Sequence, residues 1–404
     1  MDTSRMLYLT DVSAQNSLAM FMQIEQMRNA AVKLYDTMEA LLYRSQIADI
    51  VNSYYDIGTV SEVYQIFGGY VNKSFGVYTV KDGKKCEYFV RKYKVGITEQ
   101  EILFEHSFIN CAIENGLDIA AAIIRTKEDG TFVKLSEEVN GKTIDRYFAI
   151  YTYLDGEDKY TWDNNNLNDE EYKSSAEVLA KLHYATRDFD PKGLERIEPK
   201  IMEFVPTLPP KYREFAKLDL PNNRFHQYYL ANLEDILEVI ERTVTLIPKE
   251  ALAKMPMNPI HCDVHPGNFK YKDNQAVGVF DFDWAKIDLR LFDVCEALAY
   301  FCSSWEAETD GNLLIDKCGI FIKAYQEKLK ELGGLPPLNE TELQYLPDML
   351  AIANIYLVNW DVTAYYADTS VNVFEYKAYL QHNVKLMRYI ERHKEAIREM
   401  IKNL

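Results

Sequence analysis

Two short runs of the sequence hold the side chains best suited to chemistry. Residues 260–268 read Ile-His-Cys-Asp-Val-His-Pro-Gly-Asn, and residues 279–284 read Val-Phe-Asp-Phe-Asp-Trp. Phosphoryl transfer requires a carboxylate that accepts the proton of the attacking hydroxyl, and oxygen ligands for the metal ion that bridges the nucleotide phosphates. Asp263, Asn268 and Asp281 are of these types, and magnesium prefers such hard oxygen donors. The two runs together therefore predict magnesium-dependent phosphoryl transfer.

The spacing within these runs has a mechanical reason. A loop of the form H-x-D-x-x-x-x-N lets Asp263 and Asn268 approach one bound phosphate group from a single rigid segment, and a hairpin can return Asp281 to the same place. The alternative is that the string arose by chance in a turn and that Asp263 merely caps a helix. The second run stands at the right distance and in the right order, which favours phosphoryl transfer over the alternative.

The two motifs resemble the aminoglycoside phosphotransferase and choline kinase superfamily, whose catalytic loop reads H-G-D-x-x-x-x-N and whose metal-binding aspartate lies in an apolar-Asp-Phe run. The resemblance implies that the catalytic residues are Asp263, as the base, and His261, which stabilises the loop. It implies Asn268 and Asp281 as magnesium ligands. It also implies ATP (or GTP) as the phosphoryl donor and a small-molecule hydroxyl as the acceptor, on an amino alcohol, a sugar or an aminoglycoside-like compound.

Three neighbouring residues qualify this resemblance. Cys262 replaces the common glycine of the family, and Asp293, in Leu-Phe-Asp-Val, matches a further structural aspartate. A metal role for His265 would need a second histidine on the same helix face, and the following Pro-Gly argues against a helix there, so we assign His265 to loop packing or solvent. Residues 281–306 look most like the homoserine kinase and methylthioribose kinase side of the superfamily.

The segment 67–77 lies between two expected strands and contains candidate nucleotide-binding residues. Its glycines and backbone N–H groups could cover the phosphates, with Gly69, Asn72 and Ser74 in contact with the nucleotide. A hairpin turn explains the Gly-Gly pair at residues 68–69 equally well. This segment alone therefore leaves both interpretations open.

Further nucleotide-binding candidates are charged or lie at the expected hinge. The resemblance places a cation after an aliphatic residue of a strand, which favours Arg91, and two-residue alternation turns Lys92 to the opposite face. Glu105 matches the helix glutamate that pairs with this cation in the family. Tyr151 and Tyr153 belong to a run that resembles the hinge beside the adenine.

Periodicity and turn signals predict an α+β, bilobal, protein-kinase-like fold, with a small antiparallel sheet in the amino-terminal lobe and a larger, mostly helical carboxy-terminal lobe. We expect an amino-terminal helical extension over residues 1–58, a nucleotide-binding lobe over 59–155 and a catalytic and acceptor-binding lobe over 156–404. Strands are predicted within 61–94, 120–124, 131–135 and 147–154, with hairpins in 259–291. Helices are predicted within 14–55, 98–115, 170–184, 225–246, 311–332, 339–367 and 373–404.

Bulk properties limit the possible partners and compartment. Asp and Glu exceed Lys and Arg by 62 to 45, for a formal net charge of −17, which would repel nucleic acid and an anionic membrane surface. Six cysteines without a C-x-x-C pair, and the absence of a signal-like or membrane-spanning stretch, indicate a cytoplasmic protein. The amino-terminal helices are a possible homodimer contact.

Two questions stay open at this point. One is whether the chain is instead a catalytically silent, kinase-like nucleotide-binding or regulatory module, although every residue that the chemistry needs is present. The other is the identity of the acceptor, because the aromatic residues after Asp293 suit a sugar or an amine but also any helical core. Asp361, beside Trp360, is the carboxylate in this region best suited to hold an amino group.

Overall fold

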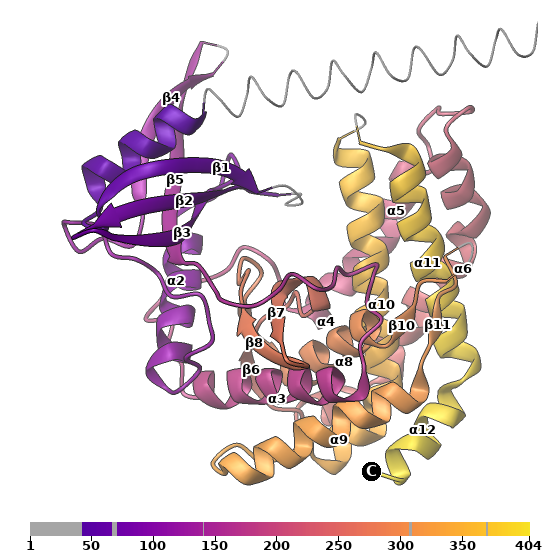
Figure 1. Ribbon diagram of the computed structural model, residues 1–404. Helices are drawn as coiled ribbons and strands as arrows, with labels where there is room; N and C mark the ends of the chain where they lie inside the picture. Colours follow the sequence, from indigo (N-terminus) through magenta and orange to yellow (C-terminus); the bar gives the residue numbers. More distant parts are fainter. Residues whose placement is uncertain (1–42, 67–70, 140, 307–308, 369–370) are drawn as a thin grey trace, which may run out of the picture. The chain divides into compact units, whose positions relative to one another are not determined.

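The computed structural model describes residues 43–66, 71–139, 141–306, 309–368 and 371–404 (Figure 1). The chain divides into two compact units. Unit 1 contains the described residues up to Gly96 together with Ile124–Tyr153, and unit 2 contains Ile97–Ile123 and Leu154–Leu404. Unit 1 holds an antiparallel sheet and unit 2 is mostly helical, so the predicted α+β class is confirmed. The expected three-part division of the chain stays a prediction.

Unit 1 is built on a five-stranded antiparallel sheet with the order β1-β2-β3-β5-β4. Two or three strands were expected between residues 61 and 94, and three are present. Strands β2 and β3 turn at Asp82-Gly83, where both residues have a positive φ. The strands are β1 (Thr59–Ile66), β2 (Lys73–Lys81), β3 (Lys84–Lys92), β4 (Val133–Val139) and β5 (Lys142–Thr152).

A helix over residues 43–54 covers one face of this sheet. Its Ile47, Ile50 and Val51 are buried in one hydrophobic cluster with Val77 and Phe148 of the strands. Burial of such side chains contributes roughly 1.5–3 kcal/mol each. The helix is therefore part of the core of unit 1, within the range where one or two helices were expected. The rest of that range lies outside the described residues.

The strand predicted over residues 120–124 is wrong. Ala120 makes only an isolated bridge to Val279, and the Ile124 N–H donates to the Ile150 carbonyl at 2.8 Å. The apolar, β-branched composition is that of a strand, but the chain passes from unit 2 to unit 1 after Ile123. No single neighbouring strand can therefore pair along the whole segment.

Unit 2 contains the helices on which the site is built, and its α6, α10 and α11 pack side by side (Figure 1). The helices predicted from residue 98 onward are confirmed, except that the expected helix over 373–404 is two helices that meet at His393. The bounds are α2 (Glu99–Glu114), α3 (Asp169–Thr186), α4 (Ile201–Phe204), η1 (Val205–Thr207), α5 (Leu208–Phe215), α6 (Arg224–Leu246), α7 (Lys249–Leu252), η2 (Pro266–Asn268), α8 (Arg290–Phe301), α9 (Ile315–Leu332), α10 (Glu340–Ala367), α11 (Val373–Arg392) and α12 (Lys394–Lys402).

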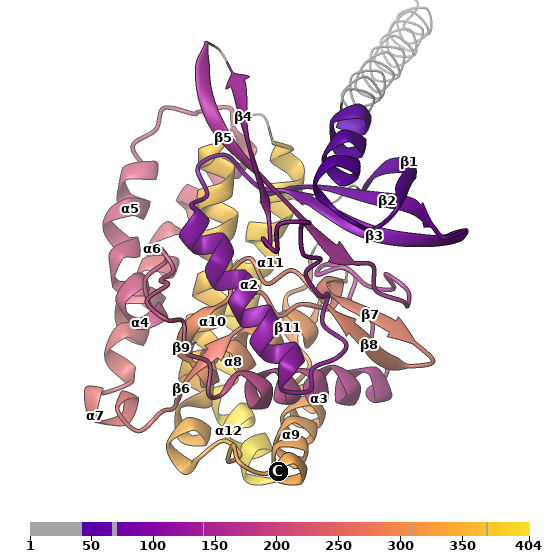
Figure 2. The same cartoon turned by 90° about the vertical axis from the view of Figure 1, so that its left-hand side faces the viewer.

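Short antiparallel pairs interrupt the helices of unit 2, as predicted for residues 259–291. The hairpin β7–β8 lies beside α3 (Figure 2), and it turns at Asp273 and Asn274, both of positive φ. Such paired residues are typical of tight hairpin turns. The strands are β6 (Met257–Ile260), β7 (Phe269–Lys272), β8 (Gln275–Val279), β9 (Lys286–Leu289), β10 (Ser303–Ser304) and β11 (Asn312–Leu313), paired as β6–β9, β7–β8 and β10–β11.

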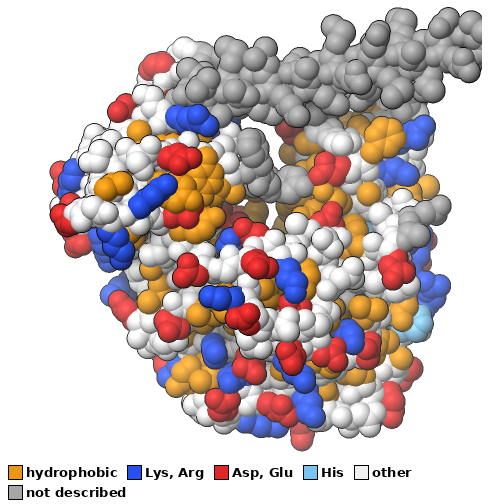
Figure 3. Space-filling view, viewed as in Figure 1, with side chains coloured by type: hydrophobic (Ala, Val, Ile, Leu, Met, Phe, Trp, Pro, Cys, Tyr) orange, Lys and Arg blue, Asp and Glu red, His pale blue; other side chains and the backbone are white. Residues whose placement is uncertain are grey.

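Charged side chains of both signs are interspersed over the face of the protein drawn in Figure 3. The acidic excess of the sequence is therefore spread among basic residues on this face. Among the described residues, no helix combines the length and the apolar character needed to cross a membrane.

Candidate functional site

The three residues predicted to carry phosphoryl transfer meet in unit 2 at the end of β6. The Asn268 Nδ2 group donates to the Asp263 backbone carbonyl at 2.9 Å and to its Oδ2 at 3.1 Å. The Phe280 N–H donates to the Asn268 backbone carbonyl at 3.1 Å, which fixes the strand end immediately before Asp281. The loop and the hairpin thus bring one amide and two carboxylates into one region.

The backbone is strained on both sides of this arrangement. Cys262 has φ +60° and Asp281 has φ +66°, and a residue with a side chain loses about 1–2 kcal/mol in this left-handed region. Strain of this kind is typical of functional sites. The conformation of Cys262 also gives a physical reason for the common glycine at this position in the superfamily that the motifs resemble.

Asp293 on α8 holds the start of the loop that carries Asp263. Its carboxylate accepts the backbone N–H groups of His261 at 3.1 Å and Cys262 at 2.7 Å, and it lies 2.8 Å from His183 Nε2. Burial alone would raise the pKa of Asp293, but the hydrogen bond and the charge of His183 hold the pKa below its usual value. The other ring nitrogen of His183 contacts the Tyr325 hydroxyl at 2.7 Å. A buried carboxylate and histidine therefore hold the residue before Asp263.

The electrostatics of the loop suit a cation. Burial and the nearby charge of Asp281 raise the pKa of Asp263 well above its usual value, and the hydrogen bond from Asn268 opposes that rise. A divalent cation bound by oxygen ligands would relieve this repulsion. The Asn268 amide oxygen and the Asp281 carboxylate are suitable donors, and magnesium completes its shell with phosphates and water. Within the described residues, no group of three or more His, Cys, Asp or Glu side chains is arranged to hold a metal ion.

The two histidines of the loop are structural in their contacts. His261 is fully buried, its Nε2 lies 3.1 Å from the Phe280 carbonyl, and burial lowers its pKa. His265 Nδ1 accepts the Gly267 N–H at 3.1 Å, and burial lowers the pKa of His265 to about 3. Both rings are therefore neutral at physiological pH, and each braces one end of the loop.

Helix α2 packs against the second motif. Phe108 lies 5.6 Å from Phe282 and 5.9 Å from Phe189, measured between ring centres. Glu105, on the same helix, is buried. The helix that carries this candidate is thus fixed next to the residue that follows Asp281.

In unit 1, the strand register places several nucleotide-binding candidates on one face. Ser74 and Arg91 are directly opposed on β2 and β3, and the Arg91 guanidinium lies 5.4 Å from the centre of the Tyr151 ring. Lys92 turns to the other face, where its Nζ lies 2.7 Å from Glu137 Oε1. The alternation argument therefore separates the two cations as expected.

The remaining candidates are less closely grouped. Asn72 Oδ1 accepts the Lys94 N–H at 2.9 Å. Burial raises the pKa of Tyr64, and hydrogen bonds with Glu87 and then Tyr153 add to the rise, so Tyr153 lies beside Tyr64. Gly69 lies outside the described residues. Arg91 belongs to unit 1 and Glu105 to unit 2, so their pairing stays a prediction.

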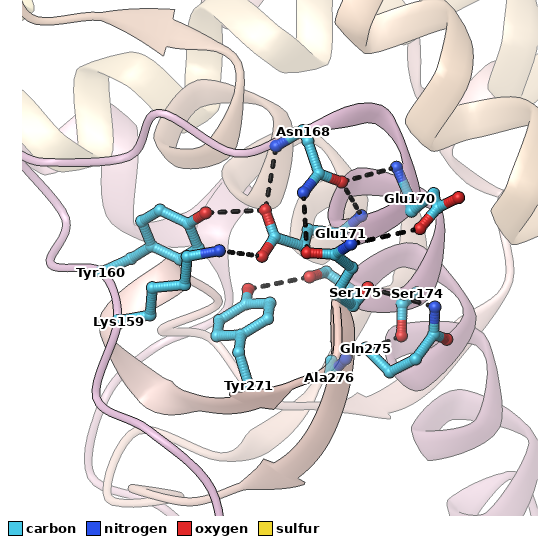
Figure 4. Close-up of polar contacts among 11 residues, drawn as sticks. Lys159, Tyr160, Asn168, Glu170, Glu171, Ser174, Ser175, Tyr271, Gln275 and Ala276 are labelled. Atoms are coloured by element: carbon cyan, nitrogen blue, oxygen red, sulfur yellow. Dashed lines mark hydrogen bonds and ion pairs between the residues drawn. The ribbon is translucent and has the colours of Figure 1, made fainter.

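One buried charged group of unit 2 was missed by sequence reasoning. Glu171 on α3 is fully buried and accepts hydrogen bonds from Lys159 Nζ at 2.5 Å, the Tyr160 hydroxyl at 2.6 Å and the Asn168 N–H at 2.9 Å (Figure 4). The Asn168-x-x-Glu171 spacing is a capping-box signal that marks the helix start. No local pattern indicates the contacts with Lys159 and Tyr160, which cross a loop.

A cluster of aromatic side chains lies in the same unit, close to the loop over residues 261–268. Trp162 has ring-centre distances of 4.1 Å to Tyr379, 5.5 Å to Trp305 and 6.1 Å to Trp360. Its neighbour Thr161 borders Gly267 of the loop, where an added Cβ would lie 3.4 Å from the Thr161 Cα. The cluster therefore adjoins the segment that carries Asn268.

With this geometry established, comparison with known proteins decides the family. The profile of the family described as "Phosphotransferase enzyme family" matches residues 68–332. The chain belongs to this family. The predicted resemblance is thereby confirmed, and the matched range contains both motifs of the site.

Known proteins similar to this phosphotransferase include homoserine kinases. That of Ralstonia nicotianae is 25% identical over 309 residues, which cover 74% of this chain and 79% of the relative. That of Methylocella silvestris is 25% identical over 312 residues, which cover 76% and 83%. These similarities agree with the branch of the superfamily indicated by the residues around Asp281.

Solved structures confirm the bilobal, protein-kinase-like fold. A microcompartment-associated aminopropanol kinase has a TM-score of 0.59 at 14% identity, covering 88% of this phosphotransferase and 98% of that chain. The choline kinase of Cryptosporidium parvum has a TM-score of 0.57 at 18% identity, covering 88% and 97%. At such identities the likeness supports the fold and not the acceptor.

Proposed function

We propose that this phosphotransferase moves the γ-phosphoryl group of ATP, or of GTP, to the hydroxyl group of a small amino alcohol, with magnesium as cofactor. The observation that carries the proposal is the pair of hydrogen bonds from Asn268 to Asp263, in a loop that is bonded to the strand end before Asp281. Membership of a phosphotransferase family supports this assignment over a catalytically silent module.

In the proposed reaction, Asp263 accepts the proton of the acceptor hydroxyl while the acceptor oxygen forms a bond to the γ-phosphorus. The bond from that phosphorus to the oxygen bridging the β-phosphate breaks, and the nucleoside diphosphate leaves. Asn268 orients Asp263 through its amide N–H, and its amide oxygen would hold magnesium together with Asp281. Magnesium, when bound, would offset the negative charge of the phosphates.

Residues of unit 1 and of α2 would bind the nucleotide. We assign the phosphates to Gly69, Asn72, Ser74 and Arg91, because Arg91 and Ser74 share one face of the sheet and a guanidinium matches phosphate oxygens. Glu105 would pair with that cation. The backbone around two further candidates, Tyr151 and Tyr153, would border the base.

An amino group on the acceptor is supported by Asp361 of α10. Asp361 is 1% exposed, accepts a hydrogen bond from Asn383 at 2.8 Å, and has a pKa raised well above its usual value by burial. Burial and the charges of Asp263, Glu296 and Asp361 raise the pKa of Tyr300, so Tyr300 lies within electrostatic range of both the base and Asp361. An ammonium group bound beside Asp361 would restore its charged form. Homoserine kinases and an aminopropanol kinase, whose names denote amino alcohols, are among the similar proteins.

We further place the reaction in the cytoplasm. All six cysteines lie in the described residues and are free thiols, which is typical of proteins in reducing compartments. The net charge of −17 supports a small-molecule partner rather than nucleic acid or a membrane surface.

The proton-accepting role is tested by Asp263→Asn. Loss of the base is expected to lower kcat by about 10²–10⁴-fold, while the affinity for magnesium and a non-hydrolysable nucleotide persists. Asp273→Asn is the control, because Asp273 is exposed at the hairpin tip and its positive φ suits asparagine. Wild-type turnover in Asp263→Asn would contradict the assignment.

The acceptor class is tested by Asp361→Asn against a panel of homoserine, aminopropanol, ethanolamine and amine-free sugars. We expect kcat/KM for the amine-bearing acceptor to fall by about 10–100-fold, with KM for the nucleotide unchanged. Asp348→Asn is the matched control, because Asp348 is also buried on α10 but pairs with Lys394 at 3.0 Å. Equal losses in both variants, or phosphorylation of sugars alone, would disprove the role of Asp361.

A further inference from the structure

The hairpin β7–β8 separates the two proposed magnesium ligands along the chain. Asn268 directly precedes β7, and Asp281 follows β8 by two residues. A two-stranded hairpin of this length is only marginally stable by itself in water, and a displacement of about 1 Å at a catalytic group can lower activity by about 10²-fold. Contacts outside the hairpin must therefore set the position of both ligands.

Backbone and polar contacts hold the hairpin at its base and near its tip. At the base, the Val279 N–H donates to the Ile119 carbonyl at 3.0 Å, and the Ala121 N–H donates to the Val279 carbonyl at 3.1 Å. Near the tip, the Ala276 N–H donates to the Ser174 hydroxyl of α3 at 2.8 Å. These contacts fix the two ends of β8 but leave the middle of β7 to be positioned separately.

Tyr271 holds the middle of β7 against α3. Its hydroxyl lies 2.9 Å from the Ser175 hydroxyl, and both side chains are buried with no more than 1% exposure (Figure 4). The backbone of Tyr271 exchanges two hydrogen bonds with Glu157, at 2.8 and 3.1 Å. Its ring packs edge-on against Tyr160 at 5.1 Å, and Tyr160 in turn donates to Glu171 of α3.

The position of β7 depends on this pair of hydroxyl groups. The register of the hairpin shifts between Lys270 and Tyr271, so the ladder alone does not fix where β7 lies. If either hydroxyl were removed, the other would be left buried without its partner, and such a group is unfavourable unless the structure shifts to solvate it. Since Asn268 is three residues from Tyr271, such a shift would reach the proposed metal ligand.

We infer that the Ser175–Tyr271 hydroxyl pair is a positioning element for magnesium, which acts through the hairpin and touches neither the metal nor the reacting groups. The inference rests on the proposed function, because it takes Asn268 and Asp281 as the magnesium ligands. By this inference, α3 holds Asn268 and Asp281 at the spacing that the cation requires.

The test measures magnesium affinity directly, by calorimetric titration of the protein in the presence of a non-hydrolysable ATP analogue. Tyr271→Phe and Ser175→Ala each remove one hydroxyl, and each is expected to weaken magnesium binding by about three- to tenfold, the loss typical of one net hydrogen bond. The magnesium affinity of the double variant should be no lower than that of the single variant with the lower affinity, because both substitutions remove the same contact.

Tyr229→Phe is the matched control. The Tyr229 hydroxyl on α6 is buried and donates to the Tyr212 carbonyl at 2.7 Å, so its loss should lower the melting temperature similarly while magnesium affinity stays unchanged. If magnesium affinity changes less than twofold in Tyr271→Phe and Ser175→Ala, the inference is overturned. Should Tyr271→Phe fail to fold, Ser175→Ala decides alone, because alanine suits a helix interior.

Asp281→Asn separates this inference from the proposed function. A carboxylate ligand replaced by an amide should weaken magnesium binding by more than either hydroxyl variant. Unchanged magnesium binding in Asp281→Asn would refute the metal assignment itself. A loss in Asp281→Asn together with no change in the two hydroxyl variants would refute only the role of the Ser175–Tyr271 pair.

Discussion

Cys262 stands where a glycine would suit the backbone better. Its φ of +60° is compatible with a side chain because Asp293 binds the two backbone N–H groups that precede the Cys262 Cα, those of His261 and of Cys262 itself. The thiol is buried and lies 3.8 Å from the Tyr356 hydroxyl. The side chain thus contributes packing that a glycine would lack, at the expense of backbone strain.

Substitution of Cys262 should separate these two effects. Cys262→Ala loses the thiol and keeps the strain, whereas Cys262→Gly loses the thiol and relieves about 1–2 kcal/mol of strain. We therefore expect Cys262→Gly to be more stable than Cys262→Ala, the reverse of the order usual for buried positions. Urea unfolding of both variants measures this, and a more stable alanine variant would show that Asp293 removes the strain entirely.

Single residues were predictable where a local rule applied. The alternation of strand side chains separated Arg91 from Lys92, and the motif spacing brought Asn268 to Asp263. Glu171 was not predictable, because its partners Lys159 and Tyr160 are eleven or twelve residues away across a loop. Contacts of that kind depend on how a loop folds back and leave no periodic signal.

Among the elements, α8 is held by a buried ion pair. Arg290 is fully buried, and its guanidinium contacts the two carboxylate oxygens of Glu342 on α10 at 3.1 and 2.6 Å. A third contact, at 2.7 Å, goes to the Pro336 carbonyl. Because Asp293 lies one turn further along α8, this pair fixes the helix that holds the loop over residues 261–268.

Replacing only one partner of this ion pair should lower the free energy of unfolding far more than replacing both partners. Arg290→Ala leaves Glu342 buried without its partner and is expected to lower the free energy of unfolding by about 3–5 kcal/mol. Arg290→Met with Glu342→Gln should recover much of that loss, because glutamine still serves the capping box of α10 at Asn339. Chemical denaturation of the wild type and the two variants tests this, and a double variant as unstable as Arg290→Ala would contradict it.

Elements were predictable where periodicity was long and capped. The helix from Thr98 and those at α3, α6, α9 and α10 follow from apolar spacing, and all but α9 begin at a capping side chain. Residues 120–124 have strand composition but are shared between two units, and the helix break at His393 has no proline or glycine to mark it. The structure of both segments depends on their tertiary contacts, and residue propensities carry no information about these contacts.

At the scale of the whole molecule, buried histidines make stability depend on pH. His382 is 1% exposed and stacks on Trp305 with 3.5 Å between ring centres, and burial, with the charge of Lys385, lowers its pKa to about 3. In the unfolded chain this ring takes up a proton below about pH 6.5, whereas in the folded protein it stays neutral until about pH 3. Stability is therefore lost as the pH falls between these values.

Replacing His382 should flatten that dependence. His382→Phe keeps an aromatic ring against Trp305 and cannot be protonated. Between pH 6.5 and 5, we expect the slope of the unfolding free energy against pH to fall by up to about 1.4 kcal/mol per pH unit. Denaturation curves at several pH values measure the slope, and an unchanged slope would mean that His382 is protonated in the folded protein.

The possible homodimer contact of the amino-terminal segment can now be tested more sharply. Residues 43–54 belong to the core of unit 1, so a deletion as far as residue 58 would unfold that unit. Deletion of residues 1–42 avoids this damage. Size-exclusion chromatography gives the apparent molecular mass of both forms. The shortened chain should show a decrease in apparent mass larger than the mass of the deleted residues. Elution as expected from mass alone would rule out the contact.

Unit 1 is not continuous in the sequence, because Ile97–Ile123 belong to unit 2. During synthesis on the ribosome, β4 and β5 emerge only after α2 has left the exit tunnel. The sheet of unit 1 therefore has only three of its strands until about residue 153 is translated. Helix α2 can pack against α3 and the carboxy-terminal helices only after these are translated as well. Nascent chains halted before that point should be digested readily by protease, and those halted well beyond it should protect the sheet.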